Sequence, residues 1–425
     1  MNGARFIHQL KIKNFLSYGS NEQIIDLQPL NVIIGSNASG KSNLIEVIGF
    51  LQASPTNLMK PIREGGGARE WIWKGNGEIS PVAKIEALIN YPDETKRIRY
   101  RLEIALVNDR LEIIDEAIEN EEKNHPSHED VYFYYRYQHG RPVINTRIVN
   151  TNELGIHQPS RRYFHSTSVP TTFQDDRRNR NLTRESLKPD QSVLSQRKDP
   201  ELYPELTYVA NQFAEIKLYR EWSFGRYNAP RQPQKVDLPE DFLLEDVSNL
   251  GLIINKLEND HNTAYQKLIE EMQVFYALAE RISTRLSGGN VQIYLHEKGL
   301  SKPIPGTRLS DGTLRYLCLL TLLLHPDPPP LICLEEPELG LHSDVLPALA
   351  RLLIDASQRT QLIVTTHSDA LISALSEVPE SVMVCERDEM GSYLNRIDPN
   401  DVQILLENHT LGELWRMGEL GGNRW

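Results

Sequence analysis

The chain has 425 residues, and 58 acidic against 46 basic residues give it a formal net charge of −12. This balance argues against a protein that coats nucleic acid over its whole surface, although a local basic patch stays open. The N-terminus lacks the apolar core of a secretory signal, and the longest apolar run, residues 317–324, is far shorter than the roughly 20 residues that span a bilayer. Three scattered cysteines in apolar runs favour buried reduced thiols, so we expect a cytoplasmic protein with no membrane partner.

The first 120 residues are rich in strand patterns. Residues 6–15 and 21–27 alternate as short strands do, and the apolar run 30–34 is typical of a buried strand. A helix is expected after residue 41, where apolar residues recur at helical spacing. Two further strands are predicted at 82–91 and 97–106. We therefore expect an N-terminal lobe, 1–120, that includes an antiparallel β-subdomain.

The middle of the chain changes character. Residues 121–200 form a polar insertion, within which 161–198 holds nine basic and four acidic residues. These cations could neutralise DNA phosphates, or the segment could be a solvated loop, and both interpretations stay open. Residues 201–300 are predicted to form a helical subdomain, with helical spacing from 246 to 286. No heptad pattern lasts long enough to predict a coiled-coil arm.

The last part, 301–425, alternates between helices and strands. Helices are expected at 312–324 and 345–356, and strands at 331–336 and 361–366. This alternation indicates a parallel sheet. The overall prediction is an α/β fold.

The strongest motif is IGSNASGKSN, residues 34–43, in which Gly35, Gly40, Lys41 and Ser42 have the spacing G-x-x-x-x-G-K-S of a phosphate-binding loop. Its glycines let backbone N–H groups surround phosphate oxygens, while the lysine reaches the outer phosphates and the serine can bind Mg²⁺. The predicted nucleotide-binding residues are Gly35, Ser36, Asn37, Ala38, Ser39, Gly40, Lys41, Ser42 and Asn43.

A second motif, LICLEEPELGLH at 331–342, ends an apolar strand with two carboxylates. An unpaired carboxylate pair at a buried strand end is costly, which favours a metal or proton-handling role. Glu335 is predicted to lie near the metal and Glu336 to orient the attacking water. The alternative is a strand that ends in a solvated acidic turn.

Two weaker motifs follow from strand and helix boundaries. RLSDGT, residues 308–313, places Ser310 and the Gly312 N–H at a helix start, where they could grip a phosphate or could simply cap the helix. His367, in IVTTHS, follows a predicted strand, and a single histidine in this position is more often structural than catalytic.

The order of these four motifs resembles that of ABC-type ATPases. The similarity is greatest to the RecF, SMC and OLD group and to related stand-alone ATPases, and it covers residues 5–55 and 300–375. The resemblance implies an ABC-type P-loop ATPase head with a mixed sheet, an antiparallel β-subdomain, a helical insertion and no long coiled coil. It also implies ATP and Mg²⁺ as bound groups.

The resemblance further assigns roles to individual residues. Lys41 and Ser42 would bind nucleotide and metal, Glu336 would be the catalytic carboxylate, and His367 the switch histidine near the γ-phosphate. Ser310 and Gly312 would contact the nucleotide of a second subunit, in a head-to-tail homodimer closed by ATP.

Three positions depart from common patterns. Asp311 and Glu335 stand where many relatives have Gly and Asp, although both look normal for RecF-like stand-alone ATPases, and His342 stands where transporter-type sequences have Asp. A glutamine that binds the metal is also expected between the two halves. Gln196 is the first candidate, with Gln191 and Gln212 as rivals.

The biological role is the least determined part. We expect an ATPase that controls a partner nuclease of the OLD or TOPRIM type in bacterial defence against phage. The competing hypotheses are a DNA-repair or chromosome-maintenance ATPase that binds DNA itself, and a transporter motor subunit, which the N-terminal pattern disfavours. The C-terminal residues Trp415, Met417 and Trp425 are expected to pack on the ATPase body or to dock a partner.

Overall fold

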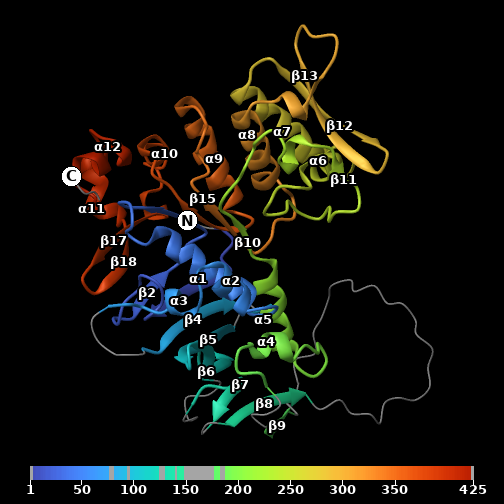
Figure 1. Ribbon diagram of the computed structural model, residues 1–425. Coiled ribbons are helices and arrows are strands. Elements are labelled where there is room, and N and C mark those ends of the chain that lie inside the picture. The colour runs from blue at the N-terminus through green and yellow to red at the C-terminus, as the bar shows by residue number, and fades with distance from the viewer. Residues whose placement is uncertain are drawn as a thin grey trace, which may run out of the picture.

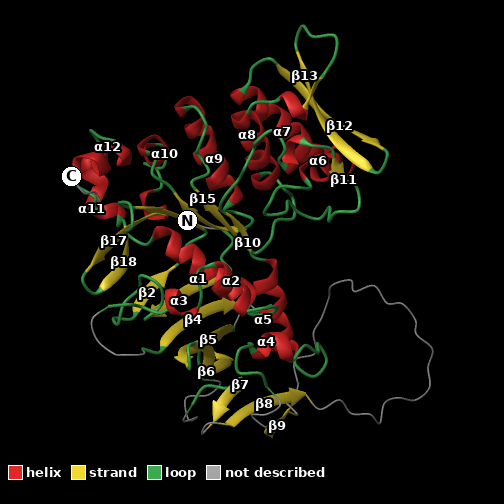
Figure 2. Ribbon diagram, in the orientation of Figure 1, coloured by secondary structure: helices red, strands yellow, loops and turns green. Residues whose placement is uncertain are grey.

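The computed structural model describes residues 3–75, 81–92, 96–123, 130–138, 141–147, 177–181 and 187–422. Most of the basic segment 161–198, and the C-terminal Trp425, lie outside the described residues. The described chain is organised around two large sheets and a smaller one (Figure 1, Figure 2).

The core sheet has six strands. Their order is β10 (Lys217–Tyr219), β15 (Leu331–Glu335), β16 (Gln361–Thr365), β3 (Leu30–Ile34), β17 (Val382–Asp388) and β18 (Gly391–Arg396). Every neighbouring pair is parallel except the β17–β18 hairpin, so the sheet is mixed as expected. The carboxyl ends of the first four strands therefore share one edge.

Both faces of this sheet are buried, and successive residues of one strand enter different cores. In β3, Val32 packs with the helices α8 (Asp311–Leu323) and α9 (Leu346–Ala356), whereas Ile33 packs with α1 (Lys41–Ala53). A continuous apolar run is typical of parallel strands covered on both sides. The helices α1 and α8 thus lie on opposite faces of the core sheet (Figure 1).

The second sheet is antiparallel and has eight strands. Their order is β2 (Gln23–Asp26), β1 (Ile7–Lys13), β4 (Ala83–Asn90), β5 (Arg97–Val107), β6 (Arg110–Asn120), β7 (Phe133–Gln138), β8 (Arg141–Arg147) and β9 (Arg177–Asn181). Because β6 pairs with β7, the domain boundary expected at residue 120 falls inside one sheet. The described strands of 121–200 extend the β-subdomain.

The region from 201 to 310 combines helices with the small sheet. Its elements are α5 (Pro204–Glu215), β11 (Gln234–Lys235), α6 (Leu250–Asp260), α7 (Asn262–Phe275), β12 (Ala279–Ser287), β13 (Asn290–Glu297) and β14 (Ile304–Pro305). The helical pattern expected through 286 is wrong after residue 275, where α7 ends. Strand β12 follows and pairs with β13 through a turn in which Gly288 and Gly289 both have positive φ. The longest helix of the described residues, α7, has 14 residues, which agrees with the absence of a long coiled coil.

Shorter helices complete the chain. They are α2 (Met59–Glu64), α3 (Ala68–Trp71), α4 (Val193–Gln196), α10 (Asp369–Ser373), α11 (Pro399–Leu406) and α12 (Leu411–Met417). Trp415 is 8% exposed and packs in the core, whereas Met417 is 55% exposed. All three cysteines are buried and free, as expected. None of the helices in the described ranges is long and apolar enough to cross a membrane.

The buried side chain of Gln361 joins the two large sheets. Gln361, at the start of β16, is fully buried, and its Oε1 accepts a hydrogen bond from the N–H of Ile7 in β1 at 2.8 Å. Its Nε2 donates to the carbonyl oxygens of Ile7 at 2.8 Å and of Gln28 at 3.0 Å. These bonds help to satisfy backbone groups between the two sheets, where the Gln28 carbonyl also accepts a hydrogen bond from Asn31 Nδ2 at 2.6 Å.

Substituting Gln361→Leu should destabilise the protein by about 2–4 kcal/mol, because it removes the side-chain partner of the Ile7 N–H and C=O and one of the two donors to the Gln28 carbonyl. Chemical denaturation monitored by circular dichroism measures the change. The control is Gln358→Leu, at an exposed position two residues after the end of α9. Equal stabilities of the two variants would contradict the role assigned to Gln361.

Candidate nucleotide-binding site

The predicted phosphate loop connects β3 to α1 in the middle of the core sheet. Gly35, Ala38 and Gly40 have positive φ, at 149°, 62° and 111°. A Cβ atom on Gly35 would lie 2.2 Å from the carbonyl oxygen of Cys385, and one on Gly40 would lie 2.3 Å from Ser392 Oγ. Glycine is therefore required at both positions by the turn and by the close packing of β17 and β18.

The loop is already shaped around its lysine. Lys41 Nζ donates to the carbonyl oxygens of Gly35 and Ser36, at 2.9 Å each. The loop is held from the other side by Ser392 Oγ, which donates to the Ser39 carbonyl at 2.6 Å. Burial lowers the pKa of Lys41, and this effect is opposed by the negative charges of nearby groups that include Glu335 and Glu336.

The first carboxylate of the second motif meets the phosphate loop directly. Ser42 lies in the first turn of α1, and its Oγ donates a hydrogen bond to Glu335 Oε1 at the end of β15. A hydroxyl and a carboxylate oxygen side by side are the hard ligands that Mg²⁺ accepts through one or two protein contacts. The donor set of Ser42 and Glu335 therefore fits the magnesium ion that was expected here.

The second carboxylate faces the histidine. Glu336 has a φ of 45°, and its N–H donates to the Thr365 carbonyl of the neighbouring strand at 3.0 Å. His367 Nε2 lies 3.6 Å from Glu336 Oε1, and both side chains are about one third exposed. Burial lowers the pKa of His367, and the charge of Lys41 lowers it further, whereas Glu336 raises it. Because the net shift is downward, the imidazole is mostly neutral at pH 7.

A third carboxylate, which the sequence reasoning missed, supports the histidine. Glu338 Oε1 accepts hydrogen bonds from Thr366 Oγ1 at 2.5 Å and from the His367 N–H at 3.2 Å. Its other oxygen is buried and meets no hydrogen-bond donor of the described residues, and burial raises the pKa of this carboxyl. The signal was present in the sequence, where Glu338 follows Glu336 by two residues in EEPE.

The signature residues lie apart from this group. Ser310 caps α8, because its Oγ accepts a hydrogen bond from the Thr313 N–H at 3.0 Å. A Cβ atom on Gly312 would lie 3.0 Å from the carbonyl oxygen of Gly340, in the loop after Glu338. Since α8 and α1 cover opposite faces of the core sheet, Ser310 and Gly312 are not brought to the phosphate loop of their own chain.

Gln196 is also not brought to the site. Its Nε2 donates to the Gln191 carbonyl at 2.7 Å, and its Oε1 accepts from the Lys188 N–H at 2.8 Å. The first residue of the same helix is fixed to the antiparallel sheet, where buried Glu116 of β6 accepts a hydrogen bond from the Val193 N–H at 2.8 Å. Gln196 therefore stabilises its own turn beside the β-subdomain.

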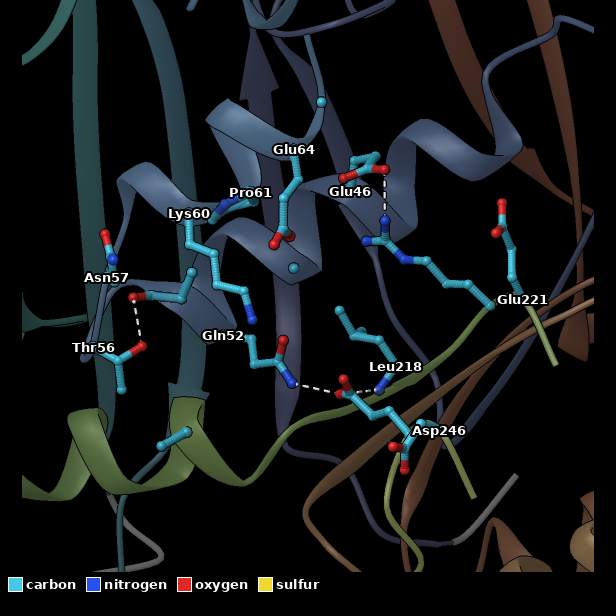
Figure 3. A pocket seen from close by; sticks show the side chains of 16 residues that line it. Glu46, Gln52, Thr56, Asn57, Lys60, Pro61, Glu64, Leu218, Glu221 and Asp246 are labelled. Carbon is cyan, nitrogen blue, oxygen red and sulfur yellow. Dashed lines mark hydrogen bonds and ion pairs between the residues drawn. The ribbon is translucent and has the colours of Figure 1, made fainter. Parts of the chain in front are cut away.

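Strand β10, rather than the segment around Gln196, lies beside the strand that carries Glu335. Strand β10 pairs with β15, so the residues that follow it, Arg220 and Glu221, lie at the edge where Glu335 lies. Arg220 Nη1 bonds Glu46 Oε1 of α1 at 2.5 Å, at one end of a groove of about 690 Å³ along α1 (Figure 3). Gln52 bridges α1 to Glu245 in the same groove at 2.7 Å. These contacts fix β10 against the phosphate-loop helix.

Comparison with known proteins places this geometry in a family. A family model described as "AAA domain, putative AbiEii toxin, Type IV TA system" matches residues 30–133 and 129–373, which is more than half of the chain. The chain belongs to this family. It is a RecF/SMC-like ABC-type ATPase by its relatives, since it is 36% identical over 102 residues to the DNA replication and repair protein RecF of Moorella thermoacetica. It is 21% identical over 378 residues, 88% of both chains, to an ATP/GTP phosphatase of Helicobacter pylori.

Solved structures show the same fold for this AAA-domain protein. The Smc head domain of Pyrococcus furiosus, bound to the C-terminal domain of ScpA, aligns with a TM-score of 0.55 at 13% identity over 95% of this chain and 98% of that one. An Smc head bound to the C-winged helix domain of ScpA gives 0.53 at 15% identity, over 94% and 100%. The match to RecF spans 26% of that relative's length and 22% of this chain.

The charges around His367 predict how its pKa responds to substitution. Lys41→Met should raise the pKa of His367, because a positive charge that opposes protonation is removed, and Glu336→Gln should lower it. Nuclear magnetic resonance of labelled imidazoles, assigned with His367→Gln, gives the titration midpoints.

The matched control is His8 in β1, whose imidazole bonds Asn90 and whose pKa should not respond to either change. Unchanged midpoints for His367 in both variants would show that Lys41 and Glu336 do not act on it.

Proposed function

We propose that this chain hydrolyses ATP to ADP and phosphate. The observation that carries the proposal is the meeting of Ser42 with Glu335, and of Glu336 with His367, beside a phosphate loop that already holds Lys41. A relative of nearly the same length, from Helicobacter pylori, is named an ATP/GTP phosphatase.

Catalysis would consist of positioning and electrostatic stabilisation. The loop amides and Lys41 hold the phosphates, and Glu336 orients a water molecule toward the γ-phosphorus, from which ADP departs. When its imidazole is neutral, His367 can accept a hydrogen bond at one ring nitrogen and donate one from the other. Bound through Ser42 and Glu335, Mg²⁺ would supply positive charge that stabilises the phosphate oxygens.

The active form in this proposal is a head-to-tail homodimer. Each site would combine the phosphate loop of one copy with Ser310 and Gly312 of the other. The support is topological: α1 and α8 cover opposite faces of one sheet, so one copy presents its phosphate loop and its signature loop in different directions (Figure 1).

Glu336→Gln should lower the rate of ATP hydrolysis by about 100-fold or more, because the amide keeps the shape but polarises water poorly. Binding of ATP should persist in this variant, whereas Lys41→Ala should lose it. A coupled phosphate-release assay and equilibrium binding of a fluorescent ATP analogue measure the two effects.

The matched control is Glu377→Gln, an exposed carboxylate after α10. If Glu336→Gln and Glu377→Gln hydrolyse ATP equally fast, Glu336 is not the catalytic carboxylate.

We further propose that ATP turnover controls a partner effector, a nuclease, in bacterial defence against phage. The support is the description of the matched family, which names an AbiEii-type toxin. The second candidate is a DNA-repair or chromosome-maintenance ATPase that binds DNA itself, and the 36% identity to RecF favours it.

Purification from the native host distinguishes the two roles. Tagged Glu336→Gln, which should stay in the ATP-bound state, is expected to retain a nuclease that Lys41→Ala does not retain. Mass spectrometry identifies the retained protein, and nuclease treatment of the lysate removes contacts through DNA. Recovery of DNA without any nuclease, from Glu336→Gln alone, would favour the repair role.

A further inference from the structure

A cavity of about 730 Å³ opens beside the signature loop. Its lining includes none of the residues that surround the phosphate loop. It is lined by the segment 224–227, by Arg231 and Gln232, and by residues 307, 308 and 311 next to α8. Its volume is in the range of small-ligand sites, about 300–1,000 Å³.

The base of the cavity is rigid because one arginine joins three segments. The Arg231 side chain is only 10% exposed, and its Nε donates to the Phe224 carbonyl at 2.6 Å. Its other nitrogens bond the Leu309 carbonyl and the Asp311 carboxylate on either side of Ser310. The signature loop and the 224–227 segment are therefore held as one unit.

A second arginine fixes the aromatic side of the same unit. The guanidinium of Arg315, in α8, lies 5.7 Å from the ring centre of Trp222 and 5.3 Å from that of Phe224. The two rings meet edge to face, 6.0 Å apart. Stacked and ion-paired contacts of this kind preorganise the segment that carries the cavity rim.

The rim itself offers unused binding groups. Arg226 and Arg308 are exposed, and neither guanidinium pairs with another residue of the described chain. Tyr227 is 84% exposed, although tyrosine rings are usually covered. Counting Arg231 and Asp311, three guanidinium groups face one carboxylate, in a protein whose net charge is −12. The cavity therefore favours a ligand that combines negative charge with a flat ring.

We propose that Arg226, Arg308 and Tyr227 form a subsite for the nucleotide that a second copy of this chain holds on its phosphate loop. The inference rests on the proposed ATPase function and extends it by naming the residues, besides the signature loop, that complete the site. The two arginines would contact phosphate oxygens, bidentately where the geometry allows, and the tyrosine ring would stack on the purine or pack on the ribose.

Two observations favour a nucleotide from another copy. The rim adjoins Ser310 and Asp311 at the start of α8, on the face of the core sheet opposite α1. The cavity is lined by two short segments, within 224–232 and 307–311, and offers two unpaired cations. This suits a single nucleotide more than an extended polyanion, whose binding accumulates over many phosphate contacts.

Mixing two inactive variants tests this arrangement. Lys41→Ala removes the phosphate-loop lysine and keeps the rim, whereas the double variant Arg226→Ala/Arg308→Ala keeps the lysine and removes the rim cations. Each alone should hydrolyse ATP at least tenfold more slowly than the wild type. Their equimolar mixture should recover up to about a quarter of the wild-type rate, because random pairing makes half of the dimers mixed and each mixed dimer contains one complete site of two.

The control is Arg63→Ala/Arg110→Ala, which should hydrolyse ATP at the wild-type rate. It removes two exposed arginines, one in α2 and one in β6, whose side chains pair with no other residue of the described chain. The rim variant should also bind ATP as tightly as the wild type, since its own phosphate loop is intact, and this binding confirms that it is folded. Tyr227→Ala should behave as the rim variant does, with a smaller loss.

Three results would overturn the inference. A rim variant as active as the Arg63→Ala/Arg110→Ala control shows that the rim does not serve hydrolysis. A mixture no faster than its components shows that the rim acts within its own chain. A rim variant that hydrolyses ATP normally but loses affinity for a fluorescent DNA oligonucleotide assigns the rim to DNA. A wild-type protein without any ATP hydrolysis refutes the proposed function itself, which is a different outcome from these three.

Discussion

Parallel pairing of four adjacent strands is the constraint on which the rest of the site depends. Because β10, β15, β16 and β3 run in one direction, the residues that follow them arrive at one edge of the core sheet. Ser42 and Glu335 are 293 residues apart in sequence and share a hydrogen bond there. Burial of both sheet faces fixes the register, since a shift by one residue would exchange the two cores.

The same sheet separates the helix that follows the phosphate loop from the helix that follows the signature loop. Alternate residues of its strands pack into different cores, one around α1 and the other around α8 and α9. The phosphate loop belongs to the first side and the signature loop to the second. In the homodimer proposed above, a second copy of the chain would supply the half that one copy lacks. The role of Arg231 is then structural, because its three hydrogen bonds hold the signature loop and the cavity rim together.

Local sequence signals identified the residues that touch the phosphate loop. The glycine pattern, the Glu335–Glu336 pair and His367 each sit directly after a strand that periodicity reveals, and a parallel sheet brings such strand ends together. The placement of Gln196 could not be predicted in this way, because a short helix capped by its own turn looks locally like any other polar segment. Strand order decides which residues lie beside Glu335, and it follows from long-range pairing that local pattern does not encode. The strand β12 was mistaken for helix for the same reason, since its partner β13 defines it.

Light scattering on the Glu336→Gln variant distinguishes catalysis by one copy from catalysis by two. With ATP and Mg²⁺, the two-copy arrangement predicts a mass twice that of the chain, which returns to the monomer mass of 48.7 kDa when ADP replaces ATP. A variant that binds ATP and yet remains at the monomer mass at micromolar concentrations would contradict it.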